Sequence, residues 1–452
     1  MASNHVLLGE ITLSANVASV VLDTIPTSGY DDLKIIYSGR STRTGSNYTD
    51  DVFIGFNGFN TNLSSRGQYS NYTGTGGLNS AVGYAGYASA DSATSGVFGS
   101  TTIYIPQYGG STAKAWSTTG VAESNNQGSC YNVIQAGLWN STSAITSITL
   151  TPGNGSWVAG SSFSVYGIAS LGTTPSTAPK ATGGDIIDND GTYWYHAFIS
   201  TGTFVPQTLI SADVLVVAGG GGGGSTNGGA GGAGGIAYFA SQSLSSQTYI
   251  CTIGAGGSGA PGGGATRGTN GVNSVFGALT AAVGGGAGGS YSTPAGVTGG
   301  SGGGGSGADV AGAAGSNTSG QGNTGYIGNT AQIGGGGGGA GAAATSKNGG
   351  NGASTYSSWG SATNTGELVG GSYYYAGGGG GGTNSGAGGD AAVAGSGGYG
   401  GGASGRNQAS LGQPTAALVN TGGGGGGSGG NGNSAPGGNG GSGIVIVRSA
   451  MV

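Results

Sequence analysis

Seven of the fifteen acidic residues of this sequence occur in three close groups, and grouped carboxylates could bind a calcium ion or cleave a glycosidic bond. The groups are Asp31-Asp32, Asp50-Asp51, and the DIIDND stretch with Asp185, Asp188 and Asp190. The first two groups flank expected strands, so we interpret them as solvated turns. We interpret DIIDND as an acidic turn before a strand, with a calcium-binding loop or a glycosidase carboxylate pair as the alternatives.

Histidine and cysteine, the residues that other catalytic and metal sites commonly use, are rare in this sequence. The sequence contains two histidines, His5 and His196, which excludes a histidine-rich metal site. Its two cysteines, Cys130 and Cys251, are far apart, whereas a disulfide framework needs more and closer pairs. We therefore expect two reduced, buried thiols, no catalytic residues, no metal and no cofactor.

Nucleotide-binding patterns are misleading in this sequence. Glycine makes up 114 of the 452 residues, so GxGxxG matches many windows by composition alone. A phosphate loop needs GK[ST] after its glycines, but the run 219–224 is followed by Ser225 and Thr226. No acidic residue follows at the distance that binds a ribose. The sequence therefore predicts neither phosphate nor dinucleotide binding.

Charge and hydropathy exclude further classes. Only 6% of the residues are charged, and the net charge is -5, so no basic patch is available to neutralise phosphates. We expect no nucleic-acid binding. No apolar run approaches the ~20 residues that span a bilayer, and the N-terminus lacks the pattern of a secretory signal. We therefore expect neither a membrane span nor a signal peptide.

The elements that would position any site divide the chain into two parts, both of them β-rich. In the first part, short runs with the apolar–polar alternation of half-buried strands are separated by turn residues. These runs are 5–13, 18–25, 33–39, 51–58, 101–106, 132–139, 144–151 and 162–169. We predict an N-terminal antiparallel β-sandwich, similar to a jelly roll, over residues 1–172, with 60–98 as a long loop. The Pro/Ser/Thr-rich stretch 173–182 is the predicted linker.

The second part, residues 183–452, begins and ends with predicted strands. We expect strands within 192–254 and at 443–449, and the runs VLVVA and IVIV are typical of buried central strands. A domain of this kind brings its two ends together in one sheet. We predict a second β-sandwich, from which an insertion of about 257–442 projects.

Runs of consecutive glycine punctuate this second part. Four of the five runs are six residues long, and they occur at 219–224, 302–305, 334–339, 377–382 and 422–427. A flexible linker is the alternative interpretation, but a linker needs neither recurrent runs nor apolar segments ahead of them. We predict a bundle of polyproline-II-type glycine helices. Without Cβ atoms these helices approach closely, and their backbone groups form hydrogen bonds between helices. The expected fold class is all-β.

Two stretches resemble a known family. DVLVVAGGGGGG (213–224) together with GIVIVRS (443–449) resembles the glycine-rich domain of bacteriophage tail-fibre and receptor-binding adhesin proteins, and residues 191–206 are similar to its opening. Residues 10–26, 135–152 and 163–170 resemble a β-sandwich module of the same virion proteins. A related arrangement occurs in the anaplastic lymphoma kinase receptor, where a tumour-necrosis-factor-like sandwich carries polyglycine helices.

The resemblance implies where binding residues lie. In phage adhesins of this type the glycine helices form a rigid scaffold, and the segments between them contact the host receptor. Here those segments are 287–301, 316–333, 345–376 and 403–421. The receptor-binding candidates are their aromatic residues: Tyr291, Tyr326, Tyr356, Trp359, Tyr373, Tyr374 and Tyr375. The alternative for each is a cap on the end of the glycine bundle.

The resemblance also implies a function and partners. We expect a non-catalytic virion protein, a tail fibre or tail-tip adhesin, that contacts other virion proteins and a host receptor, either a glycan or an outer-membrane protein. The alternatives are a capsid decoration or head-fibre protein, a cell-surface polysaccharide depolymerase, and a fragment of a eukaryotic receptor. By analogy with trimeric fibre modules we expect a homotrimer, whose closure would hide apolar strand faces.

Overall fold

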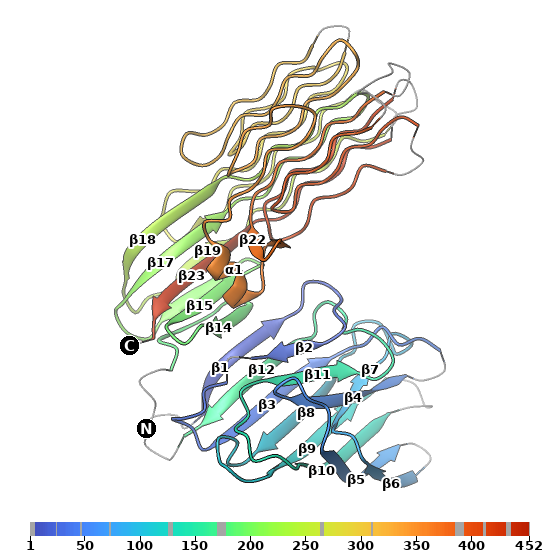
Figure 1. The fold of residues 1–452 in the computed structure, drawn as a ribbon, viewed down its shortest axis with the longest axis vertical. Coiled ribbons are helices and arrows are strands. Elements are labelled where there is room, and N and C mark those ends of the chain that lie inside the picture. Colours follow the sequence, from blue (N-terminus) through green and yellow to red (C-terminus); the bar gives the residue numbers. More distant parts are fainter. Residues whose placement is uncertain are drawn as a thin grey trace. The chain divides into compact units, whose positions relative to one another are not determined.

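The computed structural model describes residues 5–23, 25–45, 48–71, 74–124, 130–169, 178–262, 266–308, 311–384, 393–409, 413–430 and 435–451. These residues are nearly all β, as predicted, with several antiparallel sheets (Figure 1). The chain divides into two compact units. Unit 1 comprises Met1–Lys180, Asp185–Trp194 and Met451–Val452, and unit 2 comprises Ala181–Gly184 and Tyr195–Ala450. Residues 173–177 of the predicted linker, 173–182, lie outside the described residues.

Unit 1 consists of two antiparallel sheets. The larger has the order β14 (Ile186–Asn189), β1 (His5–Thr12), β12 (Ser162–Ile168), β3 (Asp32–Gly39), β8 (Gly99–Ile105), β9 (Lys114–Ala122), β10 (Tyr131–Trp139), β5 (Leu63–Asn71) and β6 (Gly74–Ser80). The smaller has the order β2 (Val20–Leu22), β11 (Ile148–Pro152), β4 (Thr49–Phe56) and β7 (Tyr84–Ser89). Both sheets contribute to one core, so the predicted antiparallel sandwich is confirmed.

Strict alternation along the strands builds this core. Every second residue of β9, and of β10 from Val133 onward, is buried, because successive side chains of a strand point to opposite faces. Aromatic rings fill the interior. Trp157 lies with its ring centroid 4.8 Å from that of Phe163 and 5.8 Å from that of Tyr37, and all three side chains are fully buried.

The prediction that residues 60–98 form a long loop is wrong, because β5, β6 and β7 lie within this stretch. Its Ser, Gly and Asn content is atypical of strands, but two glycines are required by close contacts. A Cβ atom on Gly67 would lie 2.5 Å from the Cβ of Gln135, and one on Gly76 would lie 2.4 Å from the ring of Tyr69. Contacts between strands have therefore overridden local propensity.

Unit 2 has a second pair of sheets. One has the order β18 (Ile236–Leu244), β17 (Ile210–Val217), β23 (Ile444–Ala450) and β15 (Tyr193–Phe198). The other has the order β13 (Ala181–Thr182), β16 (Gly202–Pro206), β19 (Tyr249–Thr252) and β20 (Val275–Phe276). Val214 and Val216 of β17 lie opposite Val447 and Val445 of β23, and all four are fully buried. The prediction that VLVVA and IVIV are buried strands is confirmed.

Between β20 and β23, and also directly after β17, glycine-rich segments form a bundle (Figure 1). Its hydrogen bonds repeat every three residues. The N–H groups of Gly219, Gly220 and Gly221 donate to the carbonyls of Val272, Gly441 and Gly232, and those of Gly222, Gly223 and Gly224 donate to the carbonyls of Thr269, Gly438 and Gly229. The second three partners thus lie three residues before the first three. Polyproline II has three residues per turn, so the predicted packing of glycine helices is confirmed.

The run 219–224 is surrounded on all sides. It donates to three neighbouring segments, and its carbonyls accept from three others, through the N–H groups of Gly285, Gly257 and Gly425. A Cβ atom on Gly222 would lie 2.0 Å from the carbonyl oxygen of Ser258, far inside van der Waals contact. Six hydrogen-bonded neighbouring segments leave no room for side chains, which explains why this run consists of glycine.

Candidate functional site

The glycine segments alternate in direction, so their turns gather at two ends of the bundle (Figure 1). The run 219–224 leads away from β17 to a turn at Ser225–Asn227, and residues 228–235 return to β18. We call the end with the Ser225–Asn227 turn the distal end, and the end beside β17, β18 and β23 the sheet end. Any side chain that contacts a partner of the bundle belongs to one of these ends or to its outer sides.

Two of the seven candidate aromatic residues lie toward the distal end. The N–H groups of Gly285 and Gly288 donate to the carbonyls of Gly219 and Gly222, so this segment runs parallel to 219–224 and the turn with Tyr291 is distal. The carbonyl of Tyr326 accepts a hydrogen bond from the N–H group of Gly305. Two residues later, the N–H group of Gly307 donates to the carbonyl of Asn227 in the distal turn, so Tyr326 lies near the distal end. Tyr291 and Tyr326 are each 37% exposed, and these two rings are available for contact.

The other five candidates lie at the sheet end, within 353–376. This segment contains a short helix, α1 (Ser357–Thr363), and the hairpin β21 (Glu367–Val369) and β22 (Ser372–Tyr374). The helix was not predicted, and it ends at Asn364, which has a left-handed backbone. In this segment Tyr356, Tyr373 and Tyr374 are half-buried.

Trp359 and Tyr375 are buried, and the prediction that they bind a receptor is corrected. The ring of Trp359 packs against Tyr195 and Tyr238, and the guanidinium of Arg448 lies 4.6 Å from its centroid. The hydroxyl of Tyr375 hydrogen-bonds with Thr365, and burial raises the pKa of this phenol. Both residues cap the bundle, because the α1 segment folds its apolar side inward.

One exposed aromatic residue was missed by the sequence analysis. Tyr399 is 47% exposed, and its ring centroid lies 5.6 Å from that of Tyr374. The carboxylate of Glu367 holds the adjoining turn by accepting hydrogen bonds from the N–H groups of Gly400 and Gly401, at 2.6 and 2.8 Å. An aromatic residue between glycines, as in GGYGGG, is the signal that could have identified it.

The distal turns are joined by polar side chains. Asn407 donates to the hydroxyl of Thr383 at 3.0 Å, and Asn384 donates to the side-chain oxygen of Gln332. The side chain of Asn227 accepts from the N–H group of Gly430 at 3.2 Å. Amide and hydroxyl groups therefore tie turns that are far apart in sequence into one surface.

The acidic groups have mainly structural roles. The prediction that Asp50-Asp51 forms a solvated turn is wrong, because Asp50 is fully buried and lies 3.4 Å from the guanidinium of Arg43. Burial, together with the neighbouring Asp50 carboxylate, raises the pKa of Asp51. Asp190 accepts from the N–H groups of Thr192 and Tyr193, as expected of an acidic turn. Among the described residues, no group of three His, Cys, Asp or Glu side chains could hold a metal ion.

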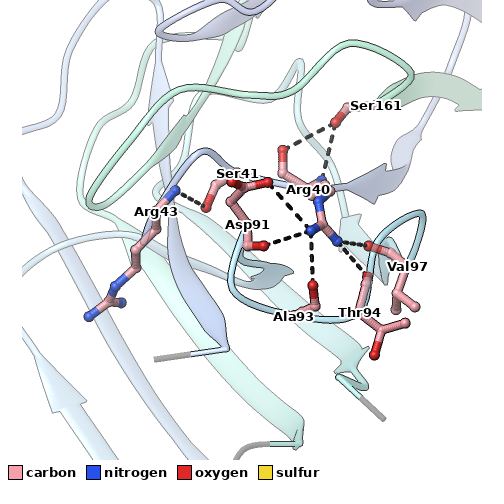
Figure 2. Close-up of polar contacts among 8 residues, drawn as sticks. All are labelled: Arg40, Ser41, Arg43, Asp91, Ala93, Thr94, Val97 and Ser161. Atoms are coloured by element: carbon pink, nitrogen blue, oxygen red, sulfur yellow. Dashed lines mark hydrogen bonds and ion pairs between the residues drawn. The ribbon is translucent and has the colours of Figure 1, made fainter. Parts of the chain in front are cut away.

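A buried arginine holds the loop 90–98 of unit 1 (Figure 2). Arg40 donates to the backbone carbonyls of Thr94, Val97, Asp91 and Ala93 at 2.9–3.1 Å. Its guanidinium also lies 3.5 Å from the Asp91 carboxylate. Because these N–H groups are engaged by the protein itself, the cluster fixes the loop.

Two further expectations concern cysteines and membranes. Neither Cys130 nor Cys251 forms a disulfide bond, as predicted, although Cys130 is only half-buried. In the described part of the chain, no helix has the length and apolar character to cross a bilayer.

Comparison with known proteins identifies the family to which most of unit 2 belongs. No curated protein matches the sequence. The family model of the glycine-rich domain matches residues 199–450, which comprise more than half of the chain and include β16, the whole bundle and β23. The chain therefore belongs to the glycine-rich domain family.

Proposed function

We propose that this chain is a non-catalytic structural and adhesive protein of a bacteriophage virion, a tail fibre or tail-tip adhesin. In this proposal the glycine bundle is a stiff support that presents its distal turns to the host-cell surface. The observation that carries it is the six-sided hydrogen bonding of 219–224, which confines discriminating side chains to the turns and the outer sides. The resemblance of 213–224 and 443–449 to phage adhesins supplies the virion context.

The distal surface is suited to recognition. Tyr291 and Tyr326 are exposed there, and tyrosine offers a large contact area at a small loss of conformational entropy. The surrounding Asn, Thr and Gln side chains are held by hydrogen bonds between turns, so the surface is ordered before binding. Its partner would be a glycan or an outer-membrane protein of the host, and other virion proteins would hold the rest of the chain.

The proposal includes a homotrimer. Ile134, Val121 and Leu138 are 70%, 51% and 42% exposed on the outer face of the larger sheet of unit 1. A chain with 6% charged residues has few charges to keep such a face soluble, and closed symmetric assembly would cover it. Light scattering of the purified chain is expected to give a trimer mass, and a monomer mass would contradict this part of the proposal.

Adsorption of the purified full chain to cells of a bacterium that the phage infects tests the adhesive role. The double variant Tyr291→Ala/Tyr326→Ala should adsorb at least about tenfold more weakly, because each anchoring aromatic contributes ~1–2 kcal/mol or more. The matched control is Tyr373→Ala/Tyr374→Ala at the sheet end, which should adsorb as the wild type does. Normal adsorption of the distal variant, or equal loss in both, would contradict the proposal.

A further inference from the structure

Unit 1 contains a half-open cavity of about 500 Å3. Its lining comes from β1, from the segment that follows β2, from Thr146, from the stretch between Asn189 and Trp194, and from Met451, all of which belong to unit 1. Small-molecule sites usually measure about 300–1,000 Å3, so the cavity has the size of a ligand site. It lies in a different unit from the glycine bundle and has no part in the function proposed above.

The deeper walls of the cavity are apolar. Leu8 and Ile25 supply aliphatic surface, and Tyr30 and Trp194 supply aromatic surface. All four side chains are buried in the core of unit 1 or against it, so the walls are held in place before any ligand enters.

Two polar side chains complement these walls. Asn189 is 8% exposed and accepts a hydrogen bond from the N–H group of Gly191 at 3.2 Å through its Oδ1 atom. Among the described residues its Nδ2 group has no hydrogen-bond partner, so a donor remains at the cavity. Asp23 is exposed at the cavity and, within the same described part of the chain, its carboxylate has no hydrogen-bonding or ionic partner.

We propose that this cavity binds a neutral sugar residue. A carboxylate acceptor and an amide donor match adjacent hydroxyl groups, and the apolar walls match the C–H face of a pyranose ring. Among the described residues, the lining contains the carboxylates of Asp23 and Asp190 and no lysine or arginine, which disfavours acidic sugars and phosphates. One hydrogen-bond donor, one acceptor and an apolar wall together are the features from which we infer a neutral sugar as the ligand.

Calorimetric titration of the full chain tests the proposal. The probes are the methyl glycosides of glucose, galactose, mannose and N-acetylglucosamine. At least one is expected to bind saturably, with a dissociation constant in the millimolar range. Asp23→Asn removes the charged acceptor, and Asn189→Asp removes the donor while keeping an oxygen for the Gly191 N–H group. Each should raise the dissociation constant at least about tenfold, as expected for the loss of a charge-assisted or buried hydrogen bond.

The matched control is Asp188→Asn, one residue before Asn189 on the opposite face of β14. This control should bind the same glycoside as tightly as the wild type. Asp23 is exposed, so its variant remains informative if Asn189→Asp fails to fold. The proposal is overturned if none of the four glycosides binds saturably, or if Asp23→Asn binds like the wild type. Binding of methylammonium in place of every glycoside would also overturn it, because the cavity would then be a cation site.

Discussion

In both the sandwich of unit 1 and the glycine bundle of unit 2, neighbouring segments form backbone hydrogen bonds with each other. The two regions differ in what fills the space between segments: side chains in the sandwich and backbone in the bundle. In the sandwich, each strand pairs within one plane, and the space between the sheets is filled by residues such as Trp157 and Phe163. In the bundle, the run 219–224 has partners on all sides, and the space that side chains would fill is occupied by backbone.

This difference teaches where each region tolerates change. A sandwich core responds to altered volume, and its outward positions are free to vary. Around 219–224 every added Cβ atom meets a carbonyl group, so even the smallest side chain is excluded. Variation in the bundle is therefore confined to turns and outer sides, the positions at which Tyr291, Tyr326 and Tyr399 are found.

The largest expected effect comes from a single methyl group inside the bundle. Gly222→Ala places Cβ 2.0 Å from the carbonyl oxygen of Ser258, and the segments must separate to admit it. We expect a loss of more than ~4 kcal/mol in the free energy of unfolding of unit 2, at the upper end of the range for point mutations. Denaturant titration followed by circular dichroism measures it.

The matched control for this change is Gly77→Ala in β6 of unit 1. An ideal Cβ atom there has no heavy atom within 4 Å, so we expect a change within ~0.5 kcal/mol. If the two substitutions destabilise the protein equally, glycine is not required by close packing in the bundle, and the contrast between the two regions fails.

A smaller effect is expected from removing the polar clamp in the sandwich. Arg40→Met leaves the carbonyls of Thr94, Val97 and Ala93 without their guanidinium donor. We expect unit 1 to lose ~2–3 kcal/mol, because the buried carbonyl of Ala93 and the partly buried carbonyls of Thr94 and Val97 retain their desolvation penalty without a donor. Arg66→Met, at an exposed position of β5, is the control and should change little. Increased proteolysis within 90–98 would identify the loop as the affected segment, and an unaltered loop would refute the clamp.

The smallest effect is a pH dependence that should appear in unit 2. Burial lowers the pKa of His196 from 6.5 to about 4, although its Nδ1 lies 2.7 Å from the carbonyl oxygen of Gly183. The unfolded chain therefore binds a proton that the folded chain does not between about pH 6.5 and pH 4. Stability is fully present above pH 6.5 and is lost as the pH falls toward 4, by ~2 kcal/mol at pH 5.

Thermal unfolding at a series of pH values measures this effect. His196→Phe, which keeps a ring against Phe204, should flatten the profile, whereas the control His5→Gln should leave it unchanged. A wild-type profile that is already flat between pH 7 and pH 5 would contradict a neutral buried imidazole.

Several elements could be predicted because their cause is local. Apolar–polar alternation marks β1, β3, β10 and β12, and the continuous apolar runs mark β17 and β23, since burial of one or both faces is written in the residue pattern. The six-glycine runs likewise indicate helices that pack without side chains. A strand such as β6 carries mainly glycine and polar residues, and only its neighbours make it a strand.

The candidate site shows the same division. The sequence by itself determined that unit 2 has a glycine scaffold and that its turns carry the aromatic residues. Only the tertiary structure decided that Tyr291 and Tyr326 lie toward the distal end while Trp359 and Tyr375 are buried at the sheet end. The physical reason is that glycine helices have no side-chain pattern to specify their neighbours. The direction and partners of each segment are set by backbone hydrogen bonds among residues far apart in the chain, such as that between Gly220 and Gly441.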